Sequence, residues 1–221
     1  MVGAKPVRIL ALSDEVVEGV YSPAIRQRVG EVDLVLGCGD VPFYYLEFVV
    51  TMLDVPLYYV HGNHDHMEQV LSDGQTVTAP QGCINLDGRV VCEQGLVLAG
   101  LGGSIRYKPT GYHQYSEGEM AWRAWQMAPA LWWNRMARGR DLDILVTHAP
   151  PFGIHDASDP AHVGFKTFLH VMRLHRPRYL IHGHSHVYRQ DAVTQTQFEA
   201  TRVINIYPYR ILEWEPAGHV R

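Results

Sequence analysis

Five apolar runs of the sequence each end in residues that can bind metal ions or transfer protons. The segments that follow these runs read Ser13-Asp14, Gly37-Cys38-Gly39-Asp40, Gly62-Asn63-His64-Asp65, Thr147-His148 and Gly183-His184-Ser185-His186. Carboxylate, amide and imidazole groups suit first-row divalent metals such as Mn, Fe, Zn or Ni better than a calcium cage or a cysteine-rich zinc site. A single Asp or His in such a place is more often a turn or capping residue. The recurrence at five successive strand ends is what predicts a metal site.

The apolar runs have the composition of buried strands. They are rich in Val, Ile, Leu and Tyr, and they occupy residues 7–12, 32–36, 56–60, 142–147 and 178–181. Helices are predicted over 23–29, 44–53 and 163–175. Strand and helix alternate, as in a wound α/β sheet, and such sheets bind ligands beyond the carboxyl ends of their strands. We therefore expect the five segments to converge on one site.

The middle of the chain has a different pattern. Short strands are predicted at 84–86, 89–92 and 96–101, with hairpin turn signals at Asp87-Gly88 and Gln94-Gly95. A helical segment over 117–138, interrupted or kinked at Pro129, precedes two more strands at 202–207 and 210–214. We expect two sheets, one wound and one with hairpins. No repeat or linker divides residues 1–221, which predicts a single domain.

The motif series resembles that of the calcineurin-like metallophosphoesterases. The resemblance rests on the residues quoted above, which occur in the family's order between about residues 8 and 190. It implies an α/β fold, a four-layer α/β/β/α sandwich with two mixed sheets, and a centre of two divalent metal ions. It also implies a bridging ligand, Asp40, a second site completed by Asn63, His148 and His184, and a first site completed by Asp14 and His186.

The same resemblance implies the hydrolysis of phosphoesters. Two metal ions roughly 4 Å apart hold a bridging hydroxide for in-line attack and neutralise the charge on the phosphoryl oxygens. His64 is not a ligand in the family pattern; we expect it to protonate the leaving group, with Asp65 fixing its tautomer. Phosphodiester substrates are favoured, since an acid helps to expel a poor alkoxide, and phosphomonoesters stay open as an alternative.

One position departs from the family pattern. The first motif is commonly Asp-x-His, whereas this chain reads Asp14-Glu15-Val16, so a valine stands where the usual imidazole ligand would be. Neighbours in an extended segment point to opposite sides, which makes Glu15 a poor replacement. We expect the first site to bind metal more weakly than the second. The alternative function is a catalytically weakened protein that uses this fold as a binding scaffold.

Three further groups of side chains are candidates for function. Arg106 follows a Gly-rich bend and suits bidentate binding of a substrate phosphate. In the loop over 150–164, polar groups either face the substrate or cap the loop, namely His155, Asp156 and His162. Four tryptophans have the spacing that is typical of the buried face of a helix: Trp122, Trp125, Trp132 and Trp133. We expect a core or cover helix there, with a lid or a subunit interface as the alternative.

Composition and charge exclude several classes of partner. The chain has 19 Lys and Arg against 23 Asp and Glu, a net charge of −4 with neutral His, which argues against a nucleic-acid clamp. The three cysteines have no metal-finger spacing, which predicts free thiols in a reducing compartment. No apolar run has the length of a membrane span or of a signal-peptide core. We expect a cytoplasmic protein that acts on a small phosphoester without a membrane partner, in an oligomeric state that these residues do not specify.

Overall fold

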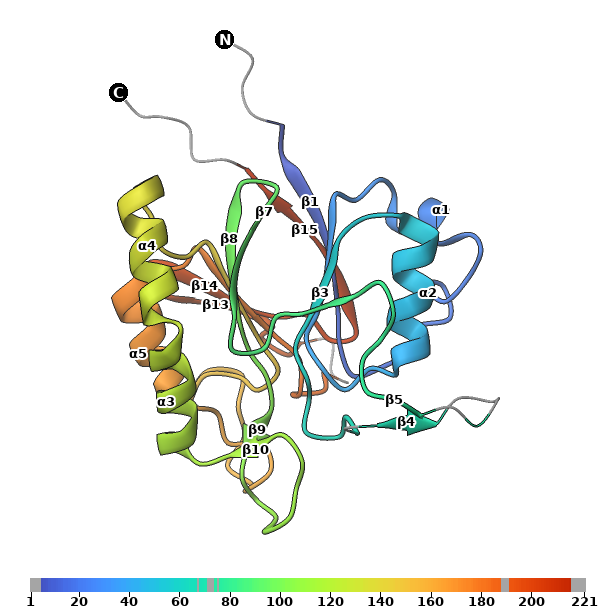
Figure 1. The fold of residues 1–221 in the computed structure, drawn as a ribbon. Coiled ribbons are helices and arrows are strands. Elements are labelled where there is room, and N and C mark those ends of the chain that lie inside the picture. The colour runs from blue at the N-terminus through green and yellow to red at the C-terminus, as the bar shows by residue number, and fades with distance from the viewer. Residues whose placement is uncertain (1–4, 67, 71–73, 75, 188–190, 216–221) are drawn as a thin grey trace.

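Two β-sheets lie between two layers of helices in the computed structural model, which describes residues 5–66, 68–70, 74, 76–187 and 191–215 (Figure 1). The first sheet has the strand order β15 (Tyr209–Trp214), β1 (Val7–Leu12), β2 (Leu34–Gly37), β3 (Leu57–Tyr59) and β6 (Ile84–Asn85). The second sheet has the order β13 (Gln195–Phe198), β14 (Thr201–Asn205), β12 (Tyr179–His182), β11 (Ile144–Thr147), β8 (Leu96–Leu101) and β7 (Val90–Glu93).

Both sheets are mixed, with parallel strands at the centre. In the first sheet β1, β2, β3 and β6 are parallel, and β15 is antiparallel to β1. In the second sheet β8, β11, β12 and β14 are parallel, while β7 and β13 pair antiparallel at the edges. Two small two-stranded sheets complete the set, β9 (Ser104–Ile105) with β10 (Gln114–Tyr115), and β4 (Gln69–Val70) with β5 (Thr76–Val77).

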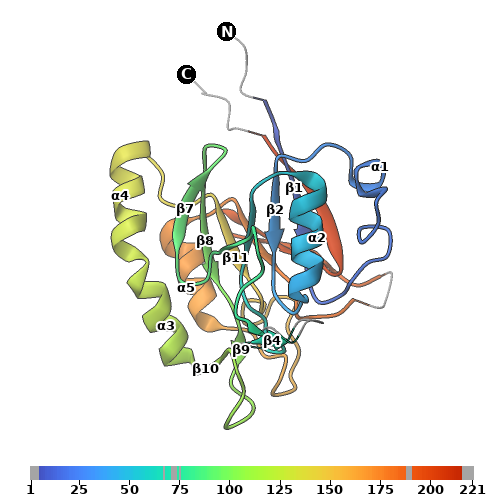
Figure 2. The ribbon, with the colours of Figure 1, turned by 45° about the vertical axis from the view of Figure 1, so that its right-hand side comes forward.

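Three apolar clusters hold the layers together. One lies between the sheets and includes Ile9 and Leu36 from the first sheet and Leu98 and Val146 from the second. The second packs α1 (Ile25–Val29) and α2 (Phe43–Leu53) on the first sheet, and the third packs α3 (Glu117–Gln126), α4 (Ala128–Arg138) and α5 (Lys166–His175) on the second. Figure 2 shows the resulting order of helix, sheet, sheet and helix. The predicted four-layer α/β/β/α sandwich is therefore confirmed.

The Asp87-Gly88 turn was wrongly predicted to close a hairpin. Strand β6 pairs parallel with β3 in the first sheet, whereas β7 pairs with β8 in the second, so the chain crosses between the sheets at this turn. Leu86 is fully buried in the cluster between the sheets and marks the crossing. The second turn signal, Gln94-Gly95, does join the antiparallel strands β7 and β8, as expected.

The tryptophan-bearing segment also differs from its prediction. The segment folds as two helices that meet at Met127, and Pro129 lies in the first turn of α4, where a missing N–H costs no helical hydrogen bond. The four tryptophans are between 57% and 66% exposed. The opposite stripe, Met120, Met127 and Leu131, is the one that packs on the second sheet. The apolar spacing correctly indicated a helix face, but the face lies outward.

Among the described residues, no helix is long and apolar enough to cross a membrane.

Candidate metal centre

The carboxyl ends of five strands that carry candidate ligands lie toward the lower end of the molecule in Figure 1. Strands β1, β2, β3, β11 and β12 are followed by Asp14, Asp40, Asn63, His148 and His184. Nε2 of His148 lies 3.0 Å from Oδ1 of Asn63 and 3.1 Å from Nδ1 of His184. It also lies 3.2 Å from Oδ2 of Asp40. The four residues assigned to the second metal site on the family pattern thus form one cluster.

Hydrogen bonds outside the cluster decide which ligand atoms are available. Nδ1–H of His148 donates to the carbonyl oxygen of Cys38 at 2.8 Å, and Nε2–H of His184 donates to the carbonyl oxygen of Ala161 at 2.8 Å. Each imidazole therefore presents its other nitrogen as a lone pair toward the cluster. These two lone pairs face the oxygens of Asn63 and Asp40. Four lone pairs that converge in this way repel one another unless a proton or a cation lies between them. Two imidazole nitrogens, a carboxylate oxygen and an amide oxygen are ligands that suit a divalent metal ion.

Charge within the cluster shifts the pKa of its members. Burial opposes the charged form of His148, but the contacts with Asp40, the charge of Asp14 and the bond to the Cys38 carbonyl together outweigh burial and raise the pKa of His148 to about 9. Burial acts against ionised Asp40 too, and the contact with His148 nevertheless lowers its pKa. Burial and the nearby charge of His148 lower the pKa of His184 to about 4. A proton and a metal ion therefore compete chiefly for Nε2 of His148.

The residues assigned to the first metal site lie beside this cluster. Both carboxylate oxygens of Asp14 accept the backbone N–H of His184, at 3.0 and 3.1 Å. Nε2 of His186 lies 3.5 Å from Oδ1 of Asp14, and the ring of His186 stacks on Tyr207 with 4.7 Å between centroids. Burial disfavours ionised Asp14, yet the contact with His186 keeps its pKa below the usual value. The structure therefore brings Asp14 and His186 together.

Val16 and Glu15 do not join Asp14 in this arrangement. The Val16 side chain packs against the apolar cluster between the first sheet and helices α1 and α2. The Glu15 carboxylate accepts a hydrogen bond from the Tyr207 hydroxyl at 2.8 Å. Within the described part of the chain, neither side chain contacts the Asp14 carboxylate. Among the described residues, the first site therefore has fewer candidate protein ligands than the second.

Close packing of glycines and left-handed backbone geometry both occur at the cluster. A Cβ added to Gly39 would lie 2.8 Å from Nδ1 of His148, which is closer than real Cβ atoms come. Three of the candidate ligands have positive φ angles, Asp14 at 63°, Asp40 at 55° and His184 at 63°. Such geometry is uncommon for residues other than glycine, and it gathers at functional sites. The backbone strain thus coincides with the predicted ligands.

His64 lies at the edge of the cluster with an exposed side chain. Its backbone N–H donates to Oδ1 of Asp40 at 2.8 Å. His64 also borders a cavity of about 210 Å³ together with Asp40, Pro42 and His66. An exposed imidazole beside the cluster is accessible to a bound molecule, as a leaving-group acid must be.

Asp65 does not contact the His64 imidazole, contrary to the predicted tautomer role. Oδ2 of Asp65 accepts the backbone N–H of Gly62 at 2.8 Å and that of Asp40 at 3.1 Å. Burial and the nearby charge of Asp40 raise the pKa of Asp65 to about 7. The side chain connects the loop after β2 to the loop after β3, so it positions ligands. In an Asn-His-Asp sequence the two neighbouring side chains can point apart, which spacing alone does not reveal.

Arg106 is engaged in an ion pair at the start of α3. Its guanidinium lies 2.9 Å from Glu119 and also donates to the carbonyl oxygen of Gln114 at 3.2 Å. The neighbouring Tyr107 is the residue that reaches the cluster: Nδ2 of Asn63 donates to its hydroxyl at 3.1 Å. This bond directs Oδ1 of Asn63 toward His148. Sequence reasoning missed Tyr107, whose only signal was its place after the Gly-rich bend.

The loop over 150–164 is divided between capping and the cluster. Oδ2 of Asp156 accepts the backbone N–H groups of Gly153 and Gly164, which makes it a capping residue. The ring of His162 lies 5.0 Å from that of His184, and His155 and His162 both border a cavity of about 490 Å³. His186 borders the same cavity. The loop therefore supplies a wall beside the first site.

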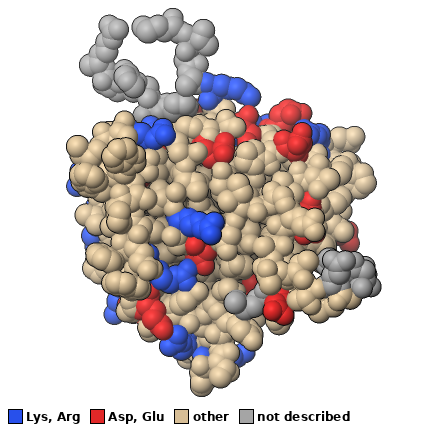
Figure 3. Space-filling view, in the orientation of Figure 1, with Lys and Arg blue, Asp and Glu red and all other residues tan. Residues whose placement is uncertain are grey.

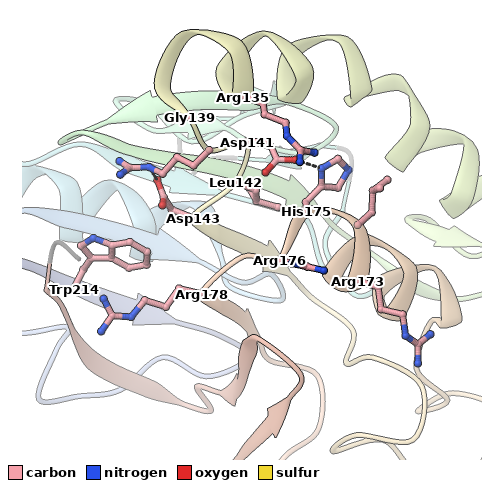
Figure 4. Close-up of a pocket in the computed structure, with 12 residues that line it drawn as sticks. Arg135, Gly139, Asp141, Leu142, Asp143, Arg173, His175, Arg176, Arg178 and Trp214 are labelled. Atoms are coloured by element: carbon pink, nitrogen blue, oxygen red, sulfur yellow. Dashed lines mark hydrogen bonds and ion pairs between the residues drawn. The ribbon is translucent and has the colours of Figure 1, made fainter. Parts of the chain in front are cut away.

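A cavity larger than those beside the cluster lies elsewhere. It measures about 650 Å³ and is lined by residues that precede β11 and β12, including Asp141, Asp143, Arg176 and Arg178 (Figure 4). These positions are at the amino ends of the strands, whereas the candidate ligands follow the carboxyl ends. The cavity contains none of the predicted site residues, so size alone does not identify the site.

Comparisons with known proteins agree with this arrangement. Residues 9–188 match the family model of the calcineurin-like phosphoesterases. An uncharacterised protein of Haemophilus influenzae is 28% identical over 144 residues, which are 59% of this chain and 62% of that protein's length. One crystal structure has a TM-score of 0.61 at 14% identity, covering 95% of both chains. The crystal structure of TT1561 of Thermus thermophilus has a TM-score of 0.59 at 16% identity, covering 91% of this chain and 89% of that one. With the fold, the motif order and the family match in agreement, the chain belongs to the calcineurin-like phosphoesterase family.

Proposed function

We propose that this protein is a metal-dependent phosphodiesterase. The observation that carries the proposal is the cluster of lone pairs from Asp40, Asn63, His148 and His184 at the strand ends of a calcineurin-like fold. Family membership supports the coarser activity, since calcineurin-like phosphoesterases generally hydrolyse phosphoric esters with divalent metals. The substrate and the roles of single residues are part of the proposal.

The proposed centre holds two divalent ions, drawn from Mn, Fe, Zn or Ni. Asp40 would bridge them, with Asn63, His148 and His184 at the second ion and Asp14 and His186 at the first. When bound, the ions neutralise the phosphoryl oxygens and lower the pKa of the attacking water. Asp65 and Tyr107 hold Asp40 and Asn63 in place through the contacts described above. The first ion is expected to bind more weakly, because Val16, which has no ligand atom, stands where the family commonly has a histidine; its side chain packs against the apolar cluster of α1 and α2.

His64 is the proposed leaving-group acid. Its imidazole is exposed beside Asp40, and among the described residues none forms a hydrogen bond with the ring, so a substrate oxygen can accept its proton. Two cavities border the centre, one at His64 and one at His186. Phosphodiesters carry substituents on two sides of phosphorus, and two cavities suit them better than phosphomonoesters, which remain the alternative substrates.

A small phosphoester is the proposed partner in the active site. On the face seen in Figure 3, basic and acidic side chains are interspersed, and the described atoms form no continuous basic stripe there. A nucleic-acid clamp would need such a stripe. A cytoplasmic location is proposed on the free thiols of Cys38, Cys83 and Cys92.

The test compares an activated aryl phosphodiester with the matching monoester. Protein stripped of metal and refilled with Mn²⁺ is assayed beside His64→Ala, with His66→Ala as the matched control from the same cavity wall. We expect metal-dependent diester turnover that falls about 10²–10⁴-fold in His64→Ala at unchanged metal content. The control should lose less than about tenfold. Turnover of neither ester with any metal by folded protein would favour the scaffold function, which the Val16 departure supports.

A further inference from the structure

The outer face of α3 and α4 is an exposed apolar stripe that the proposed activity does not use. The two helices run end to end along one side of the molecule, away from α1 and α2 (Figures 1 and 2). Trp122, Trp125, Trp132, Trp133 and Met136 are 57%, 64%, 61%, 66% and 67% exposed. The rings of Trp122 and Trp125 stack with 4.8 Å between centroids, so they form one surface. We call these five residues with Pro129 the tryptophan stripe.

The area of the tryptophan stripe is close to what a stable dimer needs. A tryptophan side chain offers up to about 250 Å², so the four exposed fractions correspond to roughly 600 Å² before Met136 and Pro129 are added. The largest apolar patch of an ordinary monomer is about 300–600 Å². A standard protein interface buries about 800 Å² per partner. The stripe is therefore large for a free surface and nearly sufficient for an interface.

The spacing of the stripe is symmetric about its centre. The buried residues Met120, Met127 and Leu131 show that the same side of α3 and of α4 faces the second sheet. The outward-facing residues of the two helices therefore also lie on one continuous side. Counted from Pro129, Trp125 and Trp133 lie four positions away on either side, and Trp122 and Met136 lie seven positions away. Two antiparallel copies related by a two-fold axis at Pro129 would place Trp125 against the partner's Trp133, and Trp122 against the partner's Met136. A two-fold interface requires this kind of self-complementary pattern.

Charge at the two ends of the helices agrees with the same packing. Helix α3 begins with Glu117 and Glu119, and α4 ends with Arg135 and Arg138. Antiparallel copies bring the acidic end of one near the basic end of the other. The side chains of Arg135 and Arg176, at the rim of the large cavity, form no ion pair with a described residue (Figure 4). Within one copy the Glu119 carboxylate pairs with Arg106 and the Glu117 carboxylate accepts from Thr167, so the match between copies is one of overall charge at the two helix ends.

We propose that the tryptophan stripe is the interface of a homodimer in which α3 and α4 pack antiparallel against their counterparts around a two-fold axis near Pro129. The occupant of this face is a second copy of the chain. The stripe lies on helices that supply no candidate ligand, so the dimer forms independently of metal and of catalysis.

The first experiment measures the mass of the full chain in solution. Sedimentation velocity and light scattering from about 1 to 100 µM should show a dimer for the wild type. Trp125→Glu/Trp133→Glu should be monomeric, with the dissociation constant raised at least about 100-fold, as expected for the loss of central aromatic contacts. Val193→Glu changes an exposed apolar residue outside the stripe and should leave the dimer intact. Circular dichroism verifies that each variant folds.

The second experiment tests the antiparallel geometry. In a Cys92→Ser background, which removes the exposed thiol, Pro129→Cys should form a disulfide-linked dimer on mild oxidation. Arg138→Cys, far from the axis, should not. A monomeric wild type, a dimer that survives the double tryptophan variant, or crosslinking at position 138 instead of 129 would overturn the proposal. A monomer that binds vesicles of anionic phospholipid through the stripe would also overturn it, in favour of a membrane surface.

Discussion

Substitution of Gly62 by alanine tests whether close packing of the backbone builds the ligand cluster. A Cβ added to Gly62 would lie 2.5 Å from the backbone nitrogen of Asp40 and nearer still to its carboxylate. Carbon atoms in contact with other heavy atoms need about 3.5 Å, so Asp40 must move by roughly 1 Å. A displacement of this size at a reacting centre costs about 100-fold in rate. Overpacking of a buried site also costs about 1–3 kcal/mol of stability.

The assay for Gly62→Ala combines Mn²⁺ titration calorimetry, metal content and kcat/KM toward the aryl phosphodiester. We expect Mn²⁺ affinity and kcat/KM to fall at least about 100-fold while the protein stays folded. The matched control is Gly118→Ala on α3, where an added Cβ meets nothing within 4 Å. The control should keep full activity and gain about 0.5–1 kcal/mol of stability from the better helix propensity of alanine. Metal affinity in Gly62→Ala within threefold of the wild type would refute the reasoning.

Four further predictions concern protonation and the residues that hold the ligands. Mn²⁺ should bind about 100-fold more tightly at pH 8 than at pH 6, because the pKa of His148 is raised to about 9 and its proton must leave; calorimetry with a pH-independent affinity would contradict this. The stability of metal-free protein should change with pH in the opposite direction to its metal affinity. Protonated His148 stabilises the fold fully below about pH 6.5, and thermal melts should show this contribution lost as pH rises through about 9. Asp65→Ala should lose about 2–4 kcal/mol in urea denaturation, since two backbone N–H groups lose their acceptor, whereas Asp65→Asn keeps an oxygen there and should retain most stability and turnover. Tyr107→Phe should weaken Mn²⁺ binding about 10-fold or more by freeing the Asn63 amide, with Arg106→Ala as a control that changes KM less than threefold.

The strands and the candidate ligands were predictable because both follow from local patterns. Strand β1 spans Val7–Leu12 as expected, since an apolar run closed by polar residues has few alternatives in a parallel sheet. The ligands follow strand ends, and parallel strands bring those ends to one edge. Convergence of Asn63, His148 and His184 is therefore a consequence of topology, which strand–helix alternation indicates.

Contacts between neighbouring side chains were less predictable. Asp65 lies next to His64 in sequence but accepts N–H groups from Gly62 and Asp40 instead. Tyr107 reaches Asn63 across 44 positions of sequence, while Arg106 turns to Glu119. These outcomes depend on the direction of each side chain from its backbone, and a spacing rule does not contain that direction.

The sequence by itself determined the alternation of the main strands and helices, the residue types at the strand ends and, through the motif series, the family; the edge strand β13 (Gln195–Phe198) was not predicted. Only the tertiary structure decided that β6 and β7 belong to different sheets, that Val16 packs into the core, and that the tryptophans face outward. The physical reason is that local patterns record the period of a helix or strand. Which of two apolar faces is buried depends on the volume and shape of the sheet that it meets. For α3 and α4 the sheet accepts the Met120, Met127 and Leu131 stripe, and the larger tryptophan stripe remains outside.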